Sequence, residues 1–252
     1  DMHSHVSMTM DIDSPTPTSD FMPAVLGRGS ARVLATIPRA QTLLGNGFTT
    51  LRNLGDPASV TYDLANAIKA GVVVGPTIIA SEPQFHVAGG DYDAFSWGER
   101  QDLEPLFHNR GTCSGVVECA RVVREEAHRG AGVIKMRIAA RPLIDTKSGP
   151  METQEELDAI VSTAHRLNLR VATHVVGDPV SSQMAIDSGT DTIEHGPLSD
   201  ANIAAMVKHH TGYTCTLLAA KTAEKAAIGL GVPPGYYDKV VVSVGKAYRA
   251  GV

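Results

Sequence analysis

The sequence predicts an α/β fold of the (β/α)8 TIM-barrel type, and three observations lead to this prediction. The 252 residues are enough to bury one large core. Short runs rich in β-branched residues alternate with amphipathic stretches of helical periodicity, a pattern typical of βαβ units and a parallel sheet. The alternation yields seven strands, one fewer than a closed barrel contains. We therefore interpret residues 1–252 as one barrel domain that lacks its closing eighth strand.

The expected elements are bounded by residues that start or stop helices. Thr153 and Glu156 have the spacing of a capping box, and Gly130, Gly189 and Gly212 lie where helices are expected to end. After a first strand that ends within 2–5, strands are expected at 49–53, 77–81, 133–137, 170–174, 192–195 and 214–217. Helices are expected at 31–44, 60–70, 114–129, 153–167, 179–188, 200–209 and 236–250.

An open, doubly wound sheet is the alternative architecture. Its glycine-rich phosphate turn, GxGxxG after the first strand, does not occur in the sequence, so we prefer the barrel. Residues 83–111 show no clear periodicity, and loops of this length in compact domains usually have a function. We expect this segment to be a long loop on the active-site face of the barrel.

The composition narrows the range of partners and compartments. The formal net charge is -5, so the chain offers no excess of basic residues to neutralise a nucleic acid. No apolar run reaches the roughly 18 residues of a membrane span, so we expect no membrane partner. Cys113, Cys119 and Cys215 form no CxxC pair, and their odd number does not predict a disulfide framework, which favours a cytoplasmic, reducing location. We expect all three to be core or helix-face residues. A targeting segment ahead of Asp1 stays compatible with the sequence.

Two histidines lie two residues apart at the end of the first expected strand. Residues i and i+2 of an extended strand point to the same face, so the imidazoles of His3 and His5 converge on one point. Two neutral imidazoles are a natural first half of a zinc site. A polar strand end without a ligand is the alternative interpretation of this pair taken alone.

Three more expected strands end in a residue that can bind a metal. Lys135 follows Val-Ile, His174 follows Ala-Thr, and His195 follows Ile-Glu. Catalytic side chains of an α/β barrel come from the C-terminal ends of several strands, where they meet over the barrel mouth. The coincidence of histidines and a lysine on so many strand ends therefore predicts a shared metal site.

Lys135 is the unusual member of this set, because a protonated amine beside two cations is strongly disfavoured. Reaction with carbon dioxide removes the positive charge and leaves a carbamate, whose two oxygens can bridge metals roughly 3.5 to 4 Å apart. The alternative is an unmodified barrel lysine that pairs with Glu194 or with a substrate anion.

Taken together, these residues resemble the amidohydrolase superfamily, in particular its imidazolonepropionase-like and metal-dependent dipeptidase or carboxypeptidase branch. The resemblance rests on the HxH of His3 and His5 and on the Ile-Lys pair at Lys135. It extends over nearly the whole chain through the segments 47–55, 164–166, 171–174 and 193–196.

The resemblance implies a binuclear metal-dependent hydrolase. His3 and His5 would bind the first metal, His174 and His195 the second, and carboxylated Lys135 would bridge them. The mixture of imidazole and oxygen ligands favours zinc. A hydroxide between the metals would attack the carbonyl of a small amide, such as a dipeptide or an N-acyl amino acid, with Lys135 and His195 as catalytic residues. Opening of a cyclic amide or a lactone is the alternative reaction.

Three residues near the barrel mouth are candidates for substrate binding. His86 and Gly90 follow the third strand, where members of the resembling branch have a glycine-rich loop that touches substrate. Arg137 lies two residues beyond Lys135, on the same face of an extended strand, and offers a bidentate fork for a substrate carboxylate. A structural salt bridge is the alternative role of Arg137.

The sequence also departs from the pattern of the branch. Members usually have an Asp after the eighth strand and a small β-sandwich, and this sequence reaches Val252 before either. We expect the acid to be supplied from outside these residues, or the exposed strand edges to be covered in a homo-oligomer. A metal-binding module or scaffold without turnover is the alternative of another class.

Overall fold

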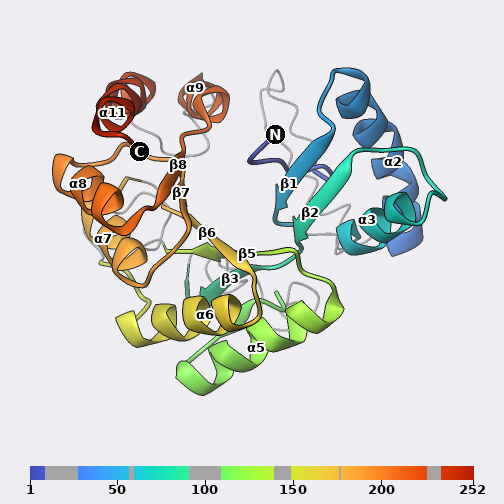
Figure 1. The fold of residues 1–252 in the computed structure, drawn as a ribbon, viewed down its shortest axis with the longest axis horizontal. Coiled ribbons are helices and arrows are strands. Elements are labelled where there is room, and N and C mark those ends of the chain that lie inside the picture. The colour runs from blue at the N-terminus through green and yellow to red at the C-terminus, as the bar shows by residue number, and fades with distance from the viewer. Residues whose placement is uncertain (9–27, 57–59, 91–108, 139–148, 176, 226–233) are drawn as a thin grey trace.

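The chain folds into parallel strands with helices packed along one side of them (Figure 1). This computed structural model describes residues 1–8, 28–56, 60–90, 109–138, 149–175, 177–225 and 234–252. Each strand pairing within these residues is parallel. Parallel neighbours need crossover connections, and the helices between strands supply them. This arrangement confirms the predicted α/β class.

The elements follow the predicted order. The strands are β1 (Thr50–Leu54), β2 (Thr77–Ser81), β3 (Gln84–Val87), β4 (Thr112–Cys113), β5 (Val133–Arg137), β6 (Arg170–His174), β7 (Thr192–Glu194) and β8 (Gly212–Thr214). The helices are α2 (Gly29–Gly45), α3 (Thr61–Lys69), α5 (Val116–Arg129), α6 (Gln154–Arg166), α7 (Pro179–Asp187), α8 (Asp200–His209), α9 (Leu217–Lys225) and α11 (Tyr236–Ala250). Most predicted elements are confirmed within a few residues of their expected bounds, and β3, β4 and α9 are additional elements that the sequence did not predict.

The strands follow an arc that corresponds to part of a barrel (Figure 1). β1 and β2 form one sheet, and the other strands form a second sheet in the order β4-β3-β5-β6-β7-β8. Hydrogen bonds join the two sheets, from Gly132 N to the Ala80 carbonyl (2.9 Å) and from Lys135 N to the Ser81 hydroxyl (3.1 Å). An isolated parallel bridge between Ser4 and Asn53 places the N-terminal segment beside β1. The strands within the described ranges do not close into a ring.

The two faces of β5 have different neighbours, which explains why ligand-capable side chains meet inside the arc. Met136 is buried in the large apolar core that the helices cover. Val133 belongs instead to a small cluster with Leu54 of β1 and Ala172 of β6. Because side chains alternate along a strand, Lys135 lies on the same face as Val133, on the inner side of the arc.

The structure corrects three predicted elements. Residues 84–87, expected to begin a loop over 83–111, form β3 with all their side chains buried; residues 91–108 of that segment lie outside the described residues. A strand that is buried on both faces shows no alternation of polar and apolar residues, so periodicity could not reveal it. The last strand is Gly212–Thr214 rather than 214–217, and α9 starts at Leu217. The expected first strand, 2–5, forms only the bridge at Ser4.

A disulfide joins Cys113 of β4 to Cys119 of α5, with their Cα atoms 5.0 Å apart. The odd number of cysteines had predicted no disulfide, and this prediction is wrong, since Cys215 is the cysteine left unbonded. Both bonded cysteines are buried, in agreement with the predicted core role. The bridge therefore ties the end of β4 to the first turn of α5.

Most local signals mark the helix ends as predicted, but Gly212 begins β8, and α8 ends instead at His210 in the left-handed conformation. The Thr153 hydroxyl accepts a hydrogen bond from Glu156 N (3.3 Å), and the Glu156 carboxylate accepts one from Thr153 N (2.9 Å), which completes the capping box of α6. Gly130 ends α5 in the left-handed conformation. In the described part of the chain, no helix combines the length and the apolar character that a membrane span requires.

A polar cluster at the N-terminal ends of the strands gives a first prediction about stability. The Asp191 carboxylate accepts hydrogen bonds from Val171 N (2.8 Å), from His165 Nε2 (2.8 Å) and from the Arg170 guanidinium. Burial alone raises the pKa of Asp191, but the hydrogen bonds from Arg170, Val171 and His165 together lower it below the usual value. The stability that Asp191 confers is therefore present above about pH 4 and is lost as the pH falls through the folded-state pKa.

We expect Asp191→Asn to lower the free energy of unfolding by about 1–3 kcal/mol at pH 7, because a charge-assisted acceptor is lost. Urea unfolding at pH 7 and at pH 3 measures the effect. The difference between wild type and variant should be smaller at pH 3 than at pH 7, because the stability that a lowered carboxyl pKa confers begins to be lost once the pH falls below the unfolded-state pKa of about 3.9. An equal loss at both pH values would contradict the assignment.

Candidate metal centre

The four histidines predicted as metal ligands lie next to one another near the C-terminal ends of the strands. The ring centroids of His3 and His5 are 5.1 Å apart, those of His3 and His195 are 4.4 Å apart, and those of His174 and His195 are 4.6 Å apart. Lys135 is close enough to lower the pKa of each of these histidines. The structure therefore brings all five predicted ligands together.

The hydrogen bonds of His3 and His5 determine which ring nitrogen carries the proton. His3 Nδ1 lies 2.7 Å from the Glu194 carboxylate, and His5 Nδ1 lies 3.1 Å from the Gly55 carbonyl. A carboxylate and a carbonyl only accept hydrogen bonds, so each Nδ1 is the donor. In the neutral rings, the Nε2 atom of each histidine then carries no proton. The two Nε2 atoms are 3.3 Å apart, so their lone pairs face each other. Two lone pairs at this distance repel unless a cation lies between them.

Burial keeps the imidazoles neutral. Desolvation lowers the pKa of His5 to about 3. It also lowers the pKa of His3, although the hydrogen bond to Glu194 opposes this effect. Desolvation places the pKa values of His174 and His195 well below the usual range. Neutral imidazole is the form that binds metals.

His195 is fixed by the neighbouring strand in an uncommon backbone conformation. Its φ is 69°, and that of Thr216, just beyond the end of β8, is 46°. His195 Nδ1 lies 2.6 Å from the Thr216 hydroxyl, and His195 N donates to the Thr214 carbonyl at 3.0 Å. A β-branched residue in the left-handed region is strained, and such strain is concentrated at functional sites. The strained backbone conformations of His195 and Thr216 therefore fix the orientation of the His195 ring.

Two buried nitrogens of the cluster lack a partner. The Lys135 amine and His174 Nε2 have no hydrogen-bond partner among the described residues. Burial lowers the pKa of Lys135 to about 7, against the opposing effect of Glu194. The Glu194 oxygens bond to Arg52 and His3 rather than to this amine. Unsatisfied buried polar groups are rare in native proteins, so these two atoms indicate a missing ligand.

The residues fit a site for divalent metal ions. Two imidazole nitrogens that bind one tetrahedral zinc at about 2.0–2.1 Å are about 3.3 Å apart, which is the Nε2–Nε2 separation of His3 and His5. Ligating histidines also tend to donate their other ring nitrogen to a carboxylate or a carbonyl, as both do here. Within the described residues, no three His, Cys, Asp or Glu side chains form a complete ligand set by themselves. The arrangement is instead two pairs of histidines with Lys135, a ligand of another type.

Arg137 borders this cluster. It is buried at the end of β5, where it pairs in register with His174 and contributes to the lowered pKa of that histidine. Its guanidinium donates a hydrogen bond to the Gln84 side chain at 3.0 Å. Arg137 therefore lies beside the histidine cluster, and its role in substrate binding stays a prediction.

His86 and Gly90 lie at and beyond the end of β3. His86 is buried, with Nδ1 2.9 Å from the Gln84 carbonyl and Nε2 3.0 Å from the Thr112 hydroxyl. Gly90 N donates to the Val87 carbonyl at 3.0 Å and so closes a turn. The ring of His86 is thus engaged by protein partners on both nitrogens, and its contact with substrate stays a prediction.

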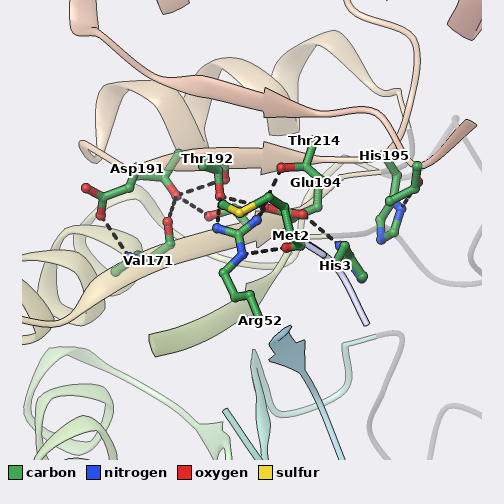
Figure 2. A network of polar contacts seen from close by, with 12 residues as sticks. Met2, His3, Arg52, Val171, Asp191, Thr192, Glu194, His195 and Thr214 are labelled. Carbon is green, nitrogen blue, oxygen red and sulfur yellow. Dashed lines mark hydrogen bonds and ion pairs between the residues drawn. The ribbon is translucent and has the colours of Figure 1, made fainter. Parts of the chain in front are cut away.

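Glu194 and Arg52 lie beside the histidine cluster (Figure 2). Sequence analysis gave Glu194 only as an alternative partner of Lys135 and assigned Arg52 no role in the site. Glu194 is fully buried and bonds to both His3 and Arg52. A signal was available, because an acid in a strand expected to be buried needs a charged partner and the strand at 49–53 contains a single arginine.

Comparisons with known proteins find relatives over almost the whole chain. Residues 1–237 match the sequence pattern of a family described as "Amidohydrolase family". Ochratoxinase of Aspergillus niger is 31% identical over 179 residues, which cover 66% of this chain and 36% of ochratoxinase. An uncharacterized protein of Mycobacterium tuberculosis is 34% identical over 217 residues, 82% of this chain and 51% of that protein. The chain thus spans between about a third and a half of the length of these relatives.

Solved structures show the same architecture. A Xaa-Pro dipeptidase with bound methionine in the active site is 28% identical, with a TM-score of 0.76, and the match covers 100% of this chain and 63% of the dipeptidase. The crystal structure of A. niger ochratoxinase is 25% identical, with a TM-score of 0.76, and the match covers 100% of this chain and 60% of ochratoxinase. These similarities confirm the predicted barrel-type fold.

Proposed function

This chain belongs to the amidohydrolase family, and we propose that it forms the metal-binding part of a hydrolase that cleaves amide bonds. The observation that carries the proposal is the pair of facing Nε2 atoms of His3 and His5, 3.3 Å apart, with no proton available to lie between them. The unpartnered Lys135 amine and His174 Nε2 support it. Metal cations between these donors are the simplest way to satisfy all of them at once.

We assign one metal position to His3 and His5 and a second to His174 and His195, with Lys135 between the two. Zinc suits this mixture of imidazole and oxygen donors. The lowered pKa of Lys135, about 7, leaves a large fraction of the amine neutral at physiological pH. The neutral amine can add to carbon dioxide and release a proton, which gives a carbamate anion suited to bridging two cations.

The residues of the chain prepare and orient the reaction. When bound, divalent ions would supply an activated water and would polarise the scissile carbonyl. His195, oriented by Thr216, would be one of the metal ligands, and Arg137 would offer its guanidinium to a carboxylate on the substrate. His86 and Gly90 complete the substrate side of the site.

The substrate we propose is a dipeptide or an N-acyl amino acid. Two structurally similar proteins support this class: a prolidase complexed with N-methylphosphonate-L-proline and the Xaa-Pro dipeptidase. A buried arginine beside the ligands is suited to the free carboxylate that such substrates carry.

Activity on a panel of dipeptides and N-acyl amino acids tests the proposal. We expect release of the free amino acid from at least one member, loss of this activity after chelation, and recovery on addition of two equivalents of zinc. Zinc uptake of two ions per chain without turnover of any panel member would indicate a metal-binding module instead. Turnover that resists complete metal removal would contradict the metal-dependent mechanism.

Arg137→Lys tests the carboxylate contact separately. Because an ammonium cannot reproduce a bidentate fork, we expect KM for carboxylate-bearing substrates to rise about tenfold or more, with little change in kcat. The matched control is the same substrate with its carboxylate amidated. A variant that affects both substrates equally would argue for a structural role of Arg137.

A further inference from the structure

A buried ion pair lies behind the histidine cluster (Figure 2). Glu194, at the end of β7, is fully buried, and Arg52, in the middle of β1, is 8% exposed. Arg52 Nη2 donates to Glu194 Oε1 at 2.7 Å. The other carboxylate oxygen, Oε2, accepts a hydrogen bond from His3 Nδ1 at 2.7 Å. One carboxylate therefore connects a buried cation to a proposed metal ligand.

We propose that Arg52 and Glu194 are positioning residues for the metal held by His3 and His5. Glu194 fixes the tautomer and the ring orientation of His3, and Arg52 fixes both Glu194 and the backbone that precedes His3. The inference rests on the proposed metal-dependent function and adds the residues that prepare one of the two metal positions. Neither residue takes part in a reaction step.

The carboxylate determines where the proton of His3 resides. Ionised Glu194 can only accept hydrogen bonds, so it holds the proton on Nδ1 and leaves the Nε2 lone pair toward His5. Without this acceptor the proton is free to move to Nε2, where it blocks the metal. A second hydrogen bond, from the Thr192 hydroxyl to Oε1 at 2.5 Å, restrains the carboxylate itself.

The guanidinium of Arg52 fixes the segment of the ligand as well as its carboxylate partner. Its Nε donates to the Met2 carbonyl at 2.6 Å, and Met2 directly precedes His3. Its remaining hydrogen bonds reach the hydroxyls of Thr192 (3.0 Å) and Thr214 (3.2 Å). One planar side chain thus joins β1 to the N-terminal segment, β7 and β8, a geometry that a lysine cannot reproduce.

Stability alone does not account for this pair. Burying an ion pair costs desolvation free energy that the attraction between the charges often only offsets. Apolar residues of similar size would therefore serve a purely structural purpose equally well.

The acid–arginine pair of Asp191 and Arg170, at the other end of β7, contacts no histidine of the cluster. It provides a matched control, because its loss affects stability without touching the metal ligands.

The test combines histidine NMR with zinc titration of the purified protein. In the metal-free wild type, ¹⁵N imidazole shifts should report His3 as the Nδ1–H tautomer. Glu194→Ala should move this signature toward the Nε2–H form, and Arg52→Lys should broaden or shift it. In a His174→Ala background, which isolates the His3–His5 position, both changes should lower zinc affinity about 10- to 100-fold.

The outcomes separate the inference from the function on which it rests. The control variant Asp191→Asn should leave the His3 tautomer and the zinc affinity at wild-type values. If Glu194→Ala does not fold, Glu194→Gln is the milder variant to test. Folded variants at Arg52 and Glu194 with the wild-type His3 tautomer and zinc affinity would overturn the inference, whereas zinc binding by the wild type would still support the proposed function. Failure of the wild type to bind zinc would overturn the function together with this inference.

Discussion

Lys135→Ala is expected to abolish hydrolysis and to leave the protein with at most one bound metal ion per chain. The amine is buried beside the four histidines and has no hydrogen-bond partner among the described residues. If it bridges two cations as a carbamate, its removal eliminates the group that keeps both ions in place. We expect kcat/KM to fall by about 10³-fold or more, which corresponds to at least about 4 kcal/mol of transition-state stabilisation. Metal analysis and kinetics at saturating zinc measure both effects.

Rescue by a small acid distinguishes a lost bridge from a damaged fold. The alanine variant leaves space where a short carboxylate can bind, so acetate or propionate should restore part of the activity and the second metal ion. Lys135→Met fills that space with an apolar chain of similar length and should not be rescued. An alanine variant that keeps two metals and near-wild-type kcat/KM would show that Lys135 is not a bridging ligand.

Sequence reasoning grouped the predicted ligands by strand ends. In the structure His174 ends β6 and His195 directly follows β7, whereas Lys135 is the central residue of β5 and His3 and His5 flank the isolated bridge at Ser4. A residue that ends a parallel strand lies at one rim of the sheet whatever the twist or the number of strands, so His174 and His195 could be grouped from the sequence. The alternation of Met136 and Lys135 between the two faces of β5 follows from the same geometry. The metal roles of these residues remain predictions.

The features that sequence reasoning missed depend on contacts between distant segments. The pairing of Arg52 with Glu194 joins residues 142 positions apart, and no local pattern indicates which acid a buried arginine will meet. The strand β3 is too short and too uniformly buried for a periodic signal. The displacement of β8 reflects the left-handed turn at Thr216, which a β-branched residue would not suggest.

Without bound metal, the fold is expected to be least stable in acid. The pKa of His5 is about 3 in the folded chain, and those of the other three ligand histidines are also lowered. An unfolded histidine binds its proton near pH 6.5, so below that pH the unfolded state takes up protons first. Each buried imidazole therefore costs stability progressively as the pH falls from about 6.5 toward its folded-state pKa. Lys135 also lowers the stability of the fold as the pH falls from 10.5, its usual pKa, to about 7, its pKa in the folded chain.

Bound zinc should reverse much of this cost at neutral and mildly alkaline pH. At a thousandfold excess over Kd, a ligand that binds only the folded state adds about 4 kcal/mol, which raises the Tm of a chain of this size by about 8–16 °C. Because protons compete with metal for the imidazoles, the zinc-dependent increment should be large at pH 8 and small at pH 5. Thermal unfolding with chelator or with zinc at both pH values measures it. Asp191→Asn should lower Tm in both metal states and preserve the increment, while His5→Ala should reduce the increment itself. Equal Tm values for the chelated and zinc-treated wild type at pH 8 would mean that the facing Nε2 atoms of His3 and His5 do not bind a metal.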